Sequence, residues 1–178
     1  KVTEKVSEAD DVQANLLYMK GRQMALDGKF EEAAPVLEQA LKANPDNAYA
    51  NHQIAEVYMR LNDFEKAEAA ASKAVAKDPT NLEYRATLGG VLASVKRYDE
   101  SKEQYRKIME LDPANAKAPL LLGILEAESG NLEAGAKVLG KAIEENGDNF
   151  MAYFYRAKIY LEMDDAKRAK ADLDKCLT

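Results

Sequence analysis

Three prolines, Pro45, Pro79 and Pro113, stand 34 residues apart, and each opens a short phrase that ends in asparagine two residues later. A fourth phrase, Gly147-Asp-Asn149, keeps the period without the proline. A fixed period of this length is typical of stacked arrays, in which each repeat is a pair of helices that cannot bury its apolar face alone. Helix-forming residues dominate the composition. The sequence therefore predicts an all-α solenoid of tandem helix-turn-helix repeats.

Aligned at this period, the chain divides into an N-terminal extension and five repeats, the last one shortened, with the limits 1–13, 14–47, 48–81, 82–115, 116–149 and 150–178. The shortened last repeat leads us to expect a fragment of a longer array. Small residues recur at the eighth position of each repeat, which holds Gly21, Ala55, Gly89, Gly123 and Ala157. We expect the two helices of a pair to approach closely there, because a bulky side chain would push them apart.

The ends of the helices are marked just as regularly. Every repeat after the first is preceded by asparagine, a preferred N-cap residue: Asn47, Asn81, Asn115 and Asn149. Inside each repeat a short polar or glycine-containing pair separates the two helices, namely Asp27-Gly28, Asn62-Asp63, Lys96-Arg97, Gly130-Asn131 and Asp164-Asp165. These signals predict two helices in each of the five repeats.

The aligned columns resemble the tetratricopeptide repeat, and the likeness covers residues 14–178. The second repeat matches the family pattern most fully, at Ile54, Ala55, Tyr58, Ala67, Ala74 and Pro79. The resemblance implies a right-handed superhelix whose first helices line a concave groove. It also implies a scaffold that binds a partner protein or a peptide segment in that groove. The repeats resemble those of bacterial proteins, some of which are envelope assembly factors.

Under this resemblance, certain positions of each first helix face the groove. In the first two repeats they hold the aromatic, arginine and amide side chains that are typical of binding hot spots: Tyr18, Met19, Arg22, Tyr49, His52, Gln53 and Glu56. In the last two repeats they are apolar: Leu120, Leu121, Ile124, Phe154 and Tyr155. An exposed patch of this kind marks an interaction site. The alternatives are that curvature tucks these side chains away, or that further repeats cover them.

The sequence offers little material for catalysis. His52 is the only histidine and Cys176 the only cysteine, so neither a two-histidine metal site nor a disulfide can form within one chain. We therefore expect a non-catalytic protein without a cofactor or a metal.

Charge and hydropathy limit the partners. The net charge is −6 and no stretch is strongly basic, so we expect no nucleic-acid partner. The longest uncharged apolar run, 118–125, is too short to span a membrane. The compartment stays open between the bacterial cytoplasm and the envelope. Two alternatives to a peptide-binding scaffold also stay open. One is a structural module that self-assembles, for example as a homodimer, and the other is the docking arm of a larger enzyme or assembly factor.

Overall fold

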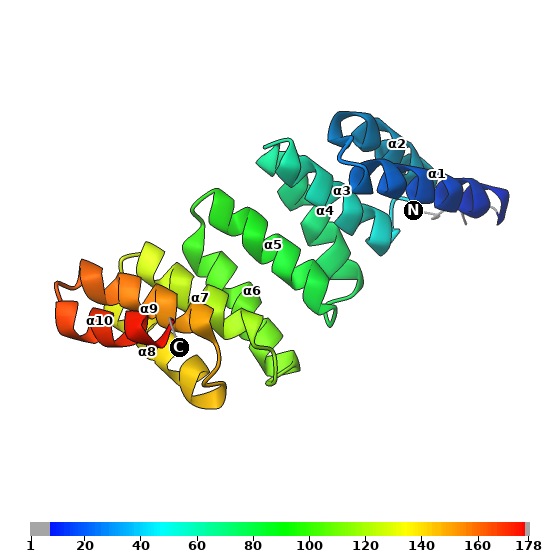
Figure 1. Cartoon of the computed structure of the whole chain (residues 1–178). Coiled ribbons are helices and arrows are strands. Elements are labelled where there is room, and N and C mark those ends of the chain that lie inside the picture. The colour runs from blue at the N-terminus through cyan, green and yellow to red at the C-terminus, as the bar shows by residue number, and fades with distance from the viewer. Residues whose placement is uncertain (1–7, 177–178) are drawn as a thin grey trace. The chain divides into compact units, whose positions relative to one another are not determined.

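The computed structural model describes residues 8–176, and the side chains of residues 11–176. Within this range the chain forms ten helices joined by short turns, and no strand (Figure 1). The helices are α1 (Glu8–Leu26), α2 (Phe30–Ala43), α3 (Ala48–Arg60), α4 (Phe64–Lys77), α5 (Leu82–Ser94), α6 (Tyr98–Leu111), α7 (Lys117–Glu128), α8 (Leu132–Glu145), α9 (Phe150–Glu162) and α10 (Ala166–Lys175). The prediction of an all-helical array of helix pairs is confirmed.

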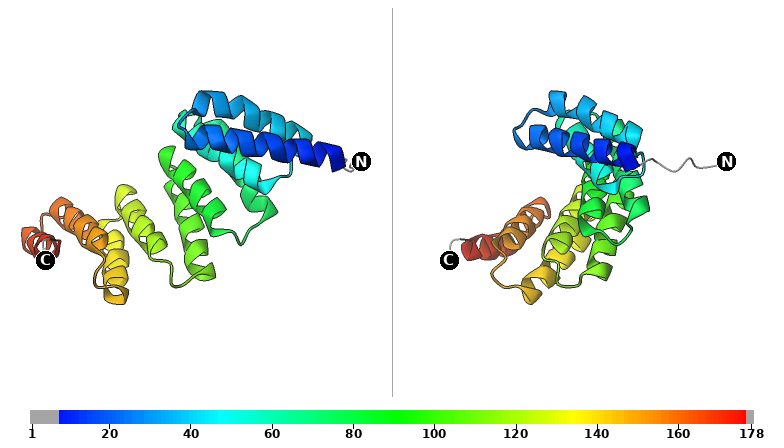
Figure 2. Two further views of the ribbon diagram at one scale, coloured as in Figure 1. Left: turned by 45° about the vertical axis from the view of Figure 1, so that its right-hand side comes forward. Right: turned by 90° about the vertical axis from the view of Figure 1, so that its right-hand side faces the viewer.

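The helices form two compact bodies, with the division between Val95 and Lys96. In the N-terminal body (α1–α5), α1 packs against α2 and α3 against α4, and the odd-numbered helices also contact one another in sequence. In the C-terminal body (α6–α10), α7 packs against α8, α9 against α10, and α7 also contacts α9. The antiparallel pairing of α1 with α2 can be followed in Figure 2. Each body therefore has an inner row of odd-numbered helices.

Each body has its own core. In the N-terminal body alanines and branched aliphatic residues are fully buried, among them Ala33, Leu37, Ile54, Val57 and Val91. In the C-terminal body the core includes Ala136, Leu139, Ile143, Ala152 and Ile159. Alanine occurs often because it allows neighbouring helices to pack at short distance while still excluding water.

The predicted close approach of paired helices is confirmed at the glycine positions. A β-carbon on Gly21 would lie 2.6 Å from the Cγ of Leu37 on the partner helix. On Gly135 it would lie 2.7 Å from the backbone oxygen of Gly123. Real β-carbons do not come this close to other atoms, so only glycine fits these two positions without movement of the helices.

The predicted asparagine caps are also confirmed. The Asn47 side chain accepts a hydrogen bond from the backbone N–H of Ala50 at 3.0 Å, and the Asn115 side chain accepts one from Ala118, also at 3.0 Å. Asn81 and Asn149 cap α5 and α9 in the same way. Each cap satisfies N–H groups that have no partner inside the helix.

The turn inside each helix pair uses one backbone state. The residue at the fifteenth position of every repeat has a positive φ: 76° at Gly28, 59° at Asn62, 62° at Lys96, 90° at Gly130 and 59° at Asp164. At Gly28 the turn is a Schellman motif, in which Lys29 N–H donates to the Met24 carbonyl and Gly28 N–H to that of Ala25. The left-handed state costs little for glycine but is unfavourable for a side chain such as that of Lys96.

None of the described helices combines the length and the hydrophobicity needed to cross a lipid bilayer.

Candidate interaction surfaces

The first candidate surface is the N-terminal inner face, which we define as the inner surface of α1, α3 and α5. Its centre is a group of rings and hydroxyls. His52 Nε2 lies 2.9 Å from Thr87 Oγ1, and its ring centre lies 5.0 Å from that of Tyr84. Tyr49 meets the Tyr84 ring edge-on at 6.3 Å. Tyr18 is half-buried and packs against the core. Tyr18, Tyr49 and His52, named from sequence, thus come from two helices that lie side by side.

Tyr84 is a member of this group that the sequence pattern did not indicate. Its side chain is buried, and burial together with the nearby Tyr49 and Asp78 raises its pKa. Tyr84 stands 35 residues after Tyr49, one more than the repeat length of 34. It therefore does not occupy the repeat position that was expected to face the groove. The signal in the sequence that could have identified Tyr84 is its near-periodic spacing from Tyr18 and Tyr49.

The other residues named for this face lie around its margin. Met19, Arg22 and Glu56 are exposed, and Gln53 is half-buried. The Gln53 amide donates a hydrogen bond to the Glu56 carboxylate at 3.2 Å. The margin therefore offers charged and amide groups around an aromatic centre.

The second candidate surface is the C-terminal inner face, formed by α7 and α9. Leu121 on α7 is 36% exposed, and Phe154 on α9 is 42% exposed. The Phe154 and Tyr155 rings meet edge-on with centres 5.5 Å apart. Leu120, in contrast, is half-buried and packs against the core of this body together with Tyr155. Of the apolar residues named from sequence, Leu121 and Phe154 are therefore the ones that remain most accessible.

A small pocket opens between these two helices, and we call it the α7–α9 pocket. Its volume is about 90 Å³, and Ile124, Ala127, Glu128, Tyr155, Lys158, Ile159 and Glu162 line it. Two of these, Ile124 and Tyr155, were named from sequence. The Lys158 amino group lies 5.5 Å from the centre of the Tyr155 ring, which is a cation–π contact. The pocket thus has an apolar floor and a charged rim.

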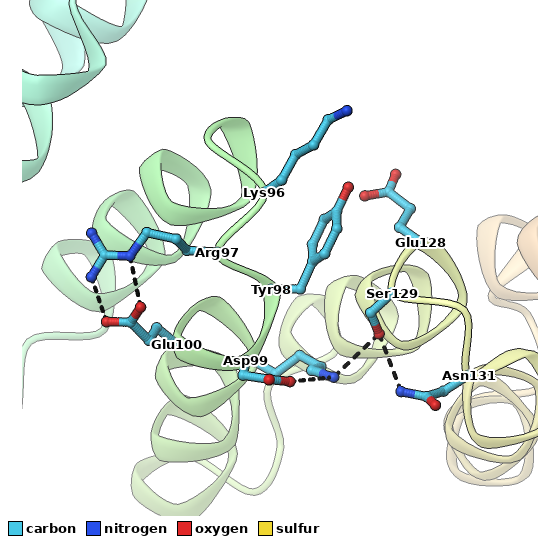
Figure 3. A pocket seen from close by; sticks show the side chains of 9 residues that line it. Lys96, Arg97, Tyr98, Asp99, Glu100, Glu128, Ser129 and Asn131 are labelled. Atoms are coloured by element: carbon cyan, nitrogen blue, oxygen red, sulfur yellow. Dashed lines mark hydrogen bonds and ion pairs between the residues drawn. The ribbon is translucent and has the colours of Figure 1, made fainter.

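A larger polar pocket lies next to it, where the start of α6 meets the end of α7 (Figure 3). Its volume is about 520 Å³, and Lys96, Arg97, Tyr98, Asp99, Glu100, Lys102, Glu128, Ser129 and Asn131 line it. Arg97 Nε donates to Glu100 Oε1 at 2.6 Å. In Figure 3 the side chains of Tyr98 and Glu128 extend toward the same side of this pocket. Glu128 lines both pockets.

Lys102 of the polar pocket also belongs to a buried ionic cluster centred on Glu126. Glu126 is the eleventh residue of its repeat, a position that holds Met24, Tyr58, Leu92 and Tyr160 in the other repeats. Lys102 Nζ lies 3.1 Å from Glu126 Oε2, and Arg106 donates to Glu126 Oε1 at 2.8 Å. Lys102 also pairs with Asp99 at 3.0 Å. Burial alone would lower the pKa of Lys102, but hydrogen bonds and charges from Asp99 and Glu126 outweigh it and raise this pKa. The cluster joins α6 to α7.

The described part of the chain holds no grouping of metal-ligating side chains. Over residues 11–176, no three His, Cys, Asp or Glu side chains are grouped as metal ligands. His52 bonds a threonine hydroxyl rather than a carboxylate or a thiol.

Three family models, each described as tetratricopeptide repeat, match the chain over residues 24–90, 82–115 and 120–175. None of the curated protein sequences matches it. Solved structures are similar in fold. MamA (41 to the end) from Desulfovibrio magneticus RS-1 is 20% identical, with a TM-score of 0.84 over 97% of this chain and 96% of its own.

Two further structures are similar. A tetratricopeptide repeat protein from Parabacteroides merdae ATCC 43184 is 26% identical, with a TM-score of 0.81 over 92% of this chain and 64% of its own. YrrB, described as a tetratricopeptide repeat protein with an unusual peptide-binding site, is 19% identical, with a TM-score of 0.74 over 90% of this chain and 83% of its own. The chain therefore belongs to the tetratricopeptide repeat family and is a non-catalytic protein-interaction module.

Proposed function

We propose that the C-terminal inner face binds an extended segment of a partner protein. The observation that carries this proposal is the exposure of Leu121 and Phe154 on adjacent helices, beside the apolar α7–α9 pocket. Leu161, also on α9, is exposed as well. Large apolar side chains gathered on one face of a protein mark interaction sites, because leaving them in water is unfavourable.

The dimensions of the α7–α9 pocket suit a single side chain of that segment. An apolar cavity of about 150 Å³ holds a benzene molecule, whereas this pocket has a volume of about 90 Å³. An aliphatic side chain such as leucine, isoleucine or valine fits this size better than an aromatic ring. The Phe154 and Tyr155 rings, held edge-to-face, give the entering chain a rigid apolar wall.

The N-terminal inner face supports a second contact surface of different chemistry. Tyr49 is 66% exposed, and its ring meets the buried Tyr84 ring edge-on. Tyrosine and arginine side chains that are held in place and accessible at the same time are common binding hot spots. We assign this face to contacts with polar or aromatic parts of a partner, through Tyr18, Tyr49 and Arg22.

Peptide binding by matched variants tests the main proposal. Peptides are first selected from a random library against the wild-type protein, and their affinity is then measured by fluorescence anisotropy. The double variant Leu121→Asp, Phe154→Asp should bind the selected peptides at least about tenfold more weakly. Leu173→Asp, on α10, is the control, because Leu173 is exposed to a similar degree but lies on another helix. Equal binding by the double variant and the wild type would place the site elsewhere.

Self-association is the competing use of the same apolar face. Light scattering over a range of protein concentrations should give the mass of one chain throughout. A mass that rises with concentration in the wild type, but not in the Leu121→Asp, Phe154→Asp variant, would show that a second copy of the chain occupies the face instead of a partner segment.

A further inference from the structure

We infer that the segment bound at the C-terminal inner face carries a lysine or arginine next to its aliphatic anchor. This inference rests on the proposed function and adds the charge of the ligand to it. It follows from the carboxylates at the rim of the α7–α9 pocket and from their position at helix ends. It also follows from the interactions that nearby lysine and arginine side chains already make with other groups.

The rim carries two glutamate carboxylates, one from each helix. Glu128 is the last residue of α7, Glu162 is the last residue of α9, and both line the pocket. Both side chains are exposed. Among the described residues, neither side chain has an ion-pair or hydrogen-bond partner. Two acidic groups therefore line one apolar pocket.

Their position at the helix ends is unfavourable in the absence of a cation. The C-terminal end of a helix carries a partial negative charge, so acidic residues are disfavoured there and basic ones are preferred. Both helices that line this pocket end in glutamate. A cation supplied by the bound segment would interact favourably with both carboxylates and with both helix ends.

The cations nearby are already engaged or lie on another side. Lys158 lines the pocket, but its amino group lies over the Tyr155 ring. With Glu128 and Glu162 it leaves the rim with a formal charge of −1. Three further cations, Lys96, Arg97 and Lys102, line the polar pocket on the other side of Glu128. Arg97 pairs with Glu100 (Figure 3), and Lys102 pairs with Asp99. Lys96 is exposed and extends from the turn before α6 on that side of Glu128 (Figure 3).

The same view suggests a second contact for the incoming cation. The Tyr98 side chain extends toward the side of the polar pocket where Glu128 lies (Figure 3). A lysine or arginine that reaches Glu128 from the α7–α9 pocket would also approach this aromatic ring, which favours cations.

Helix geometry sets the distance between anchor and cation. Ile124 on the floor and Glu128 on the rim are one helical turn apart on α7. One turn rises about 5.4 Å, and an extended chain advances about 3.3 Å per residue. The basic residue should therefore follow or precede the aliphatic anchor by one or two positions.

Three short fluorescein-labelled peptides test the inference by anisotropy. The first combines leucines with flanking lysines, the second replaces the lysines with glutamates, and the third keeps the lysines but replaces the leucines with serines. The wild type should bind the leucine–lysine peptide about fivefold more tightly than the leucine–glutamate peptide at low salt, as expected for two exposed ion pairs. The difference should shrink at high salt because the pairs are exposed.

A charge-reversal variant supplies the decisive comparison. Glu128→Lys, Glu162→Lys should reverse the preference between the two leucine peptides, and lysine at helix C-termini favours folding. The control Glu144→Lys, Glu145→Lys makes the same change in net charge at the end of α8, outside the α7–α9 pocket, and should leave the preference unchanged.

The possible outcomes separate this inference from the proposed function. If both leucine peptides bind equally tightly and the serine peptide does not bind, the inference about charge is wrong and the apolar face keeps its function. If the control variant reverses the preference as well, the effect belongs to the overall charge and the inference is again wrong. If neither leucine peptide binds, both proposals fail.

Discussion

Gly123 on α7 lies so close to Leu139 on α8 that a β-carbon on the glycine would stand 2.6 Å from the leucine Cγ. Leu139 is fully buried in the core of the C-terminal body. Gly21 and Leu37 show the same relation, with the same distance, in the first helix pair. A glycine opposite a leucine thus sets the spacing of the helices in both bodies.

Gly123→Ala should destabilise the protein by about 1 to 2 kcal/mol, because overpacking a tight helix contact costs more than the higher helix propensity of alanine returns. Urea unfolding followed by circular dichroism measures the change. Gly147→Ala is the control, because a β-carbon there would have no neighbour within 4 Å. A Gly123→Ala variant as stable as the wild type would show that the two helices can separate without cost.

The ionic cluster makes a second prediction. Glu126→Ala should destabilise the protein by about 3 kcal/mol, because it leaves the buried Lys102 without its main buried partner. The double variant Glu126→Leu, Lys102→Met should recover most of this loss, since apolar residues of similar size often replace a buried ion pair without cost. Urea unfolding of Glu126→Leu, of Lys102→Met and of the double variant gives the coupling between the two residues. If the changes in the free energy of unfolding were additive, Glu126 and Lys102 would not interact.

The left-handed backbone at Lys96 predicts a stabilising substitution. Lys96→Gly should raise the free energy of unfolding by about 0.5 to 1 kcal/mol, because removal of the strain outweighs the extra backbone entropy of glycine. Thermal or urea unfolding measures it. Lys96→Ala removes the same side chain but keeps the strain, so it should bring no gain. An equal gain from alanine would assign the effect to the lysine side chain instead.

The asparagine caps predict a smaller effect. Asn47→Ala should cost about 1 kcal/mol, because the Ala50 N–H at the start of α3 loses its side-chain acceptor. Asn47→Ser keeps an acceptor at the same place and should stay close to the wild type. Both are measured by urea unfolding. A serine variant as unstable as the alanine variant would mean that Asn47 acts through something other than its cap.

Two aspartate caps predict how stability depends on pH. The hydrogen bond from Lys66 lowers the pKa of Asp63, and the backbone hydrogen bond from Arg168 lowers that of Asp165. A carboxyl whose pKa is lower in the folded state stabilises the fold above its unfolded pKa, about 3.9 for aspartate. This stabilisation is lost as the pH falls through the folded pKa.

Unfolding free energies should therefore change little around neutral pH and fall below about pH 4. NMR titration of the two side-chain carboxyl carbons checks the direct claim. If Asp63 and Asp165 titrated at or above the aspartate value of unfolded peptides, the assigned hydrogen bonds would be wrong. Asp63→Asn, which keeps the cap but removes the charge, should make the acid-side fall shallower.

Much of the fold could be predicted because it depends on residues that repeat. The period of Pro45, Pro79 and Pro113 predicts the helix pairs, and the small residue at Gly21 predicts the close packing that the structure shows there. The left-handed turn at Lys96 could not be predicted in this way, because neither glycine nor asparagine stands there. Its conformation comes from the surrounding pattern and not from its own preference.

The candidate surfaces were predictable to a smaller extent. Ile124 and Tyr155 were assigned to one face and do line one pocket. The contact between Glu126 and Lys102 joins residues 24 apart on different helices, and no column of the alignment relates the two. Likewise Leu120 and Leu121 are adjacent in sequence, yet only packing decides that Leu120 contacts the core. Contacts specific to one repeat are not visible in a pattern shared by all repeats.

The recurring left-handed turn affects how an array of this kind can gain repeats in evolution. Each repeat contains both the residue that reverses the chain, as at Gly28 or Asn62, and the asparagine that starts the next helix, as at Asn47. Duplication of one 34-residue stretch of the gene would therefore add a helix pair that already has its own turn and cap. The inner side chains of the new copy could then change to bind another ligand, while its turn residue and its cap residue stay the same.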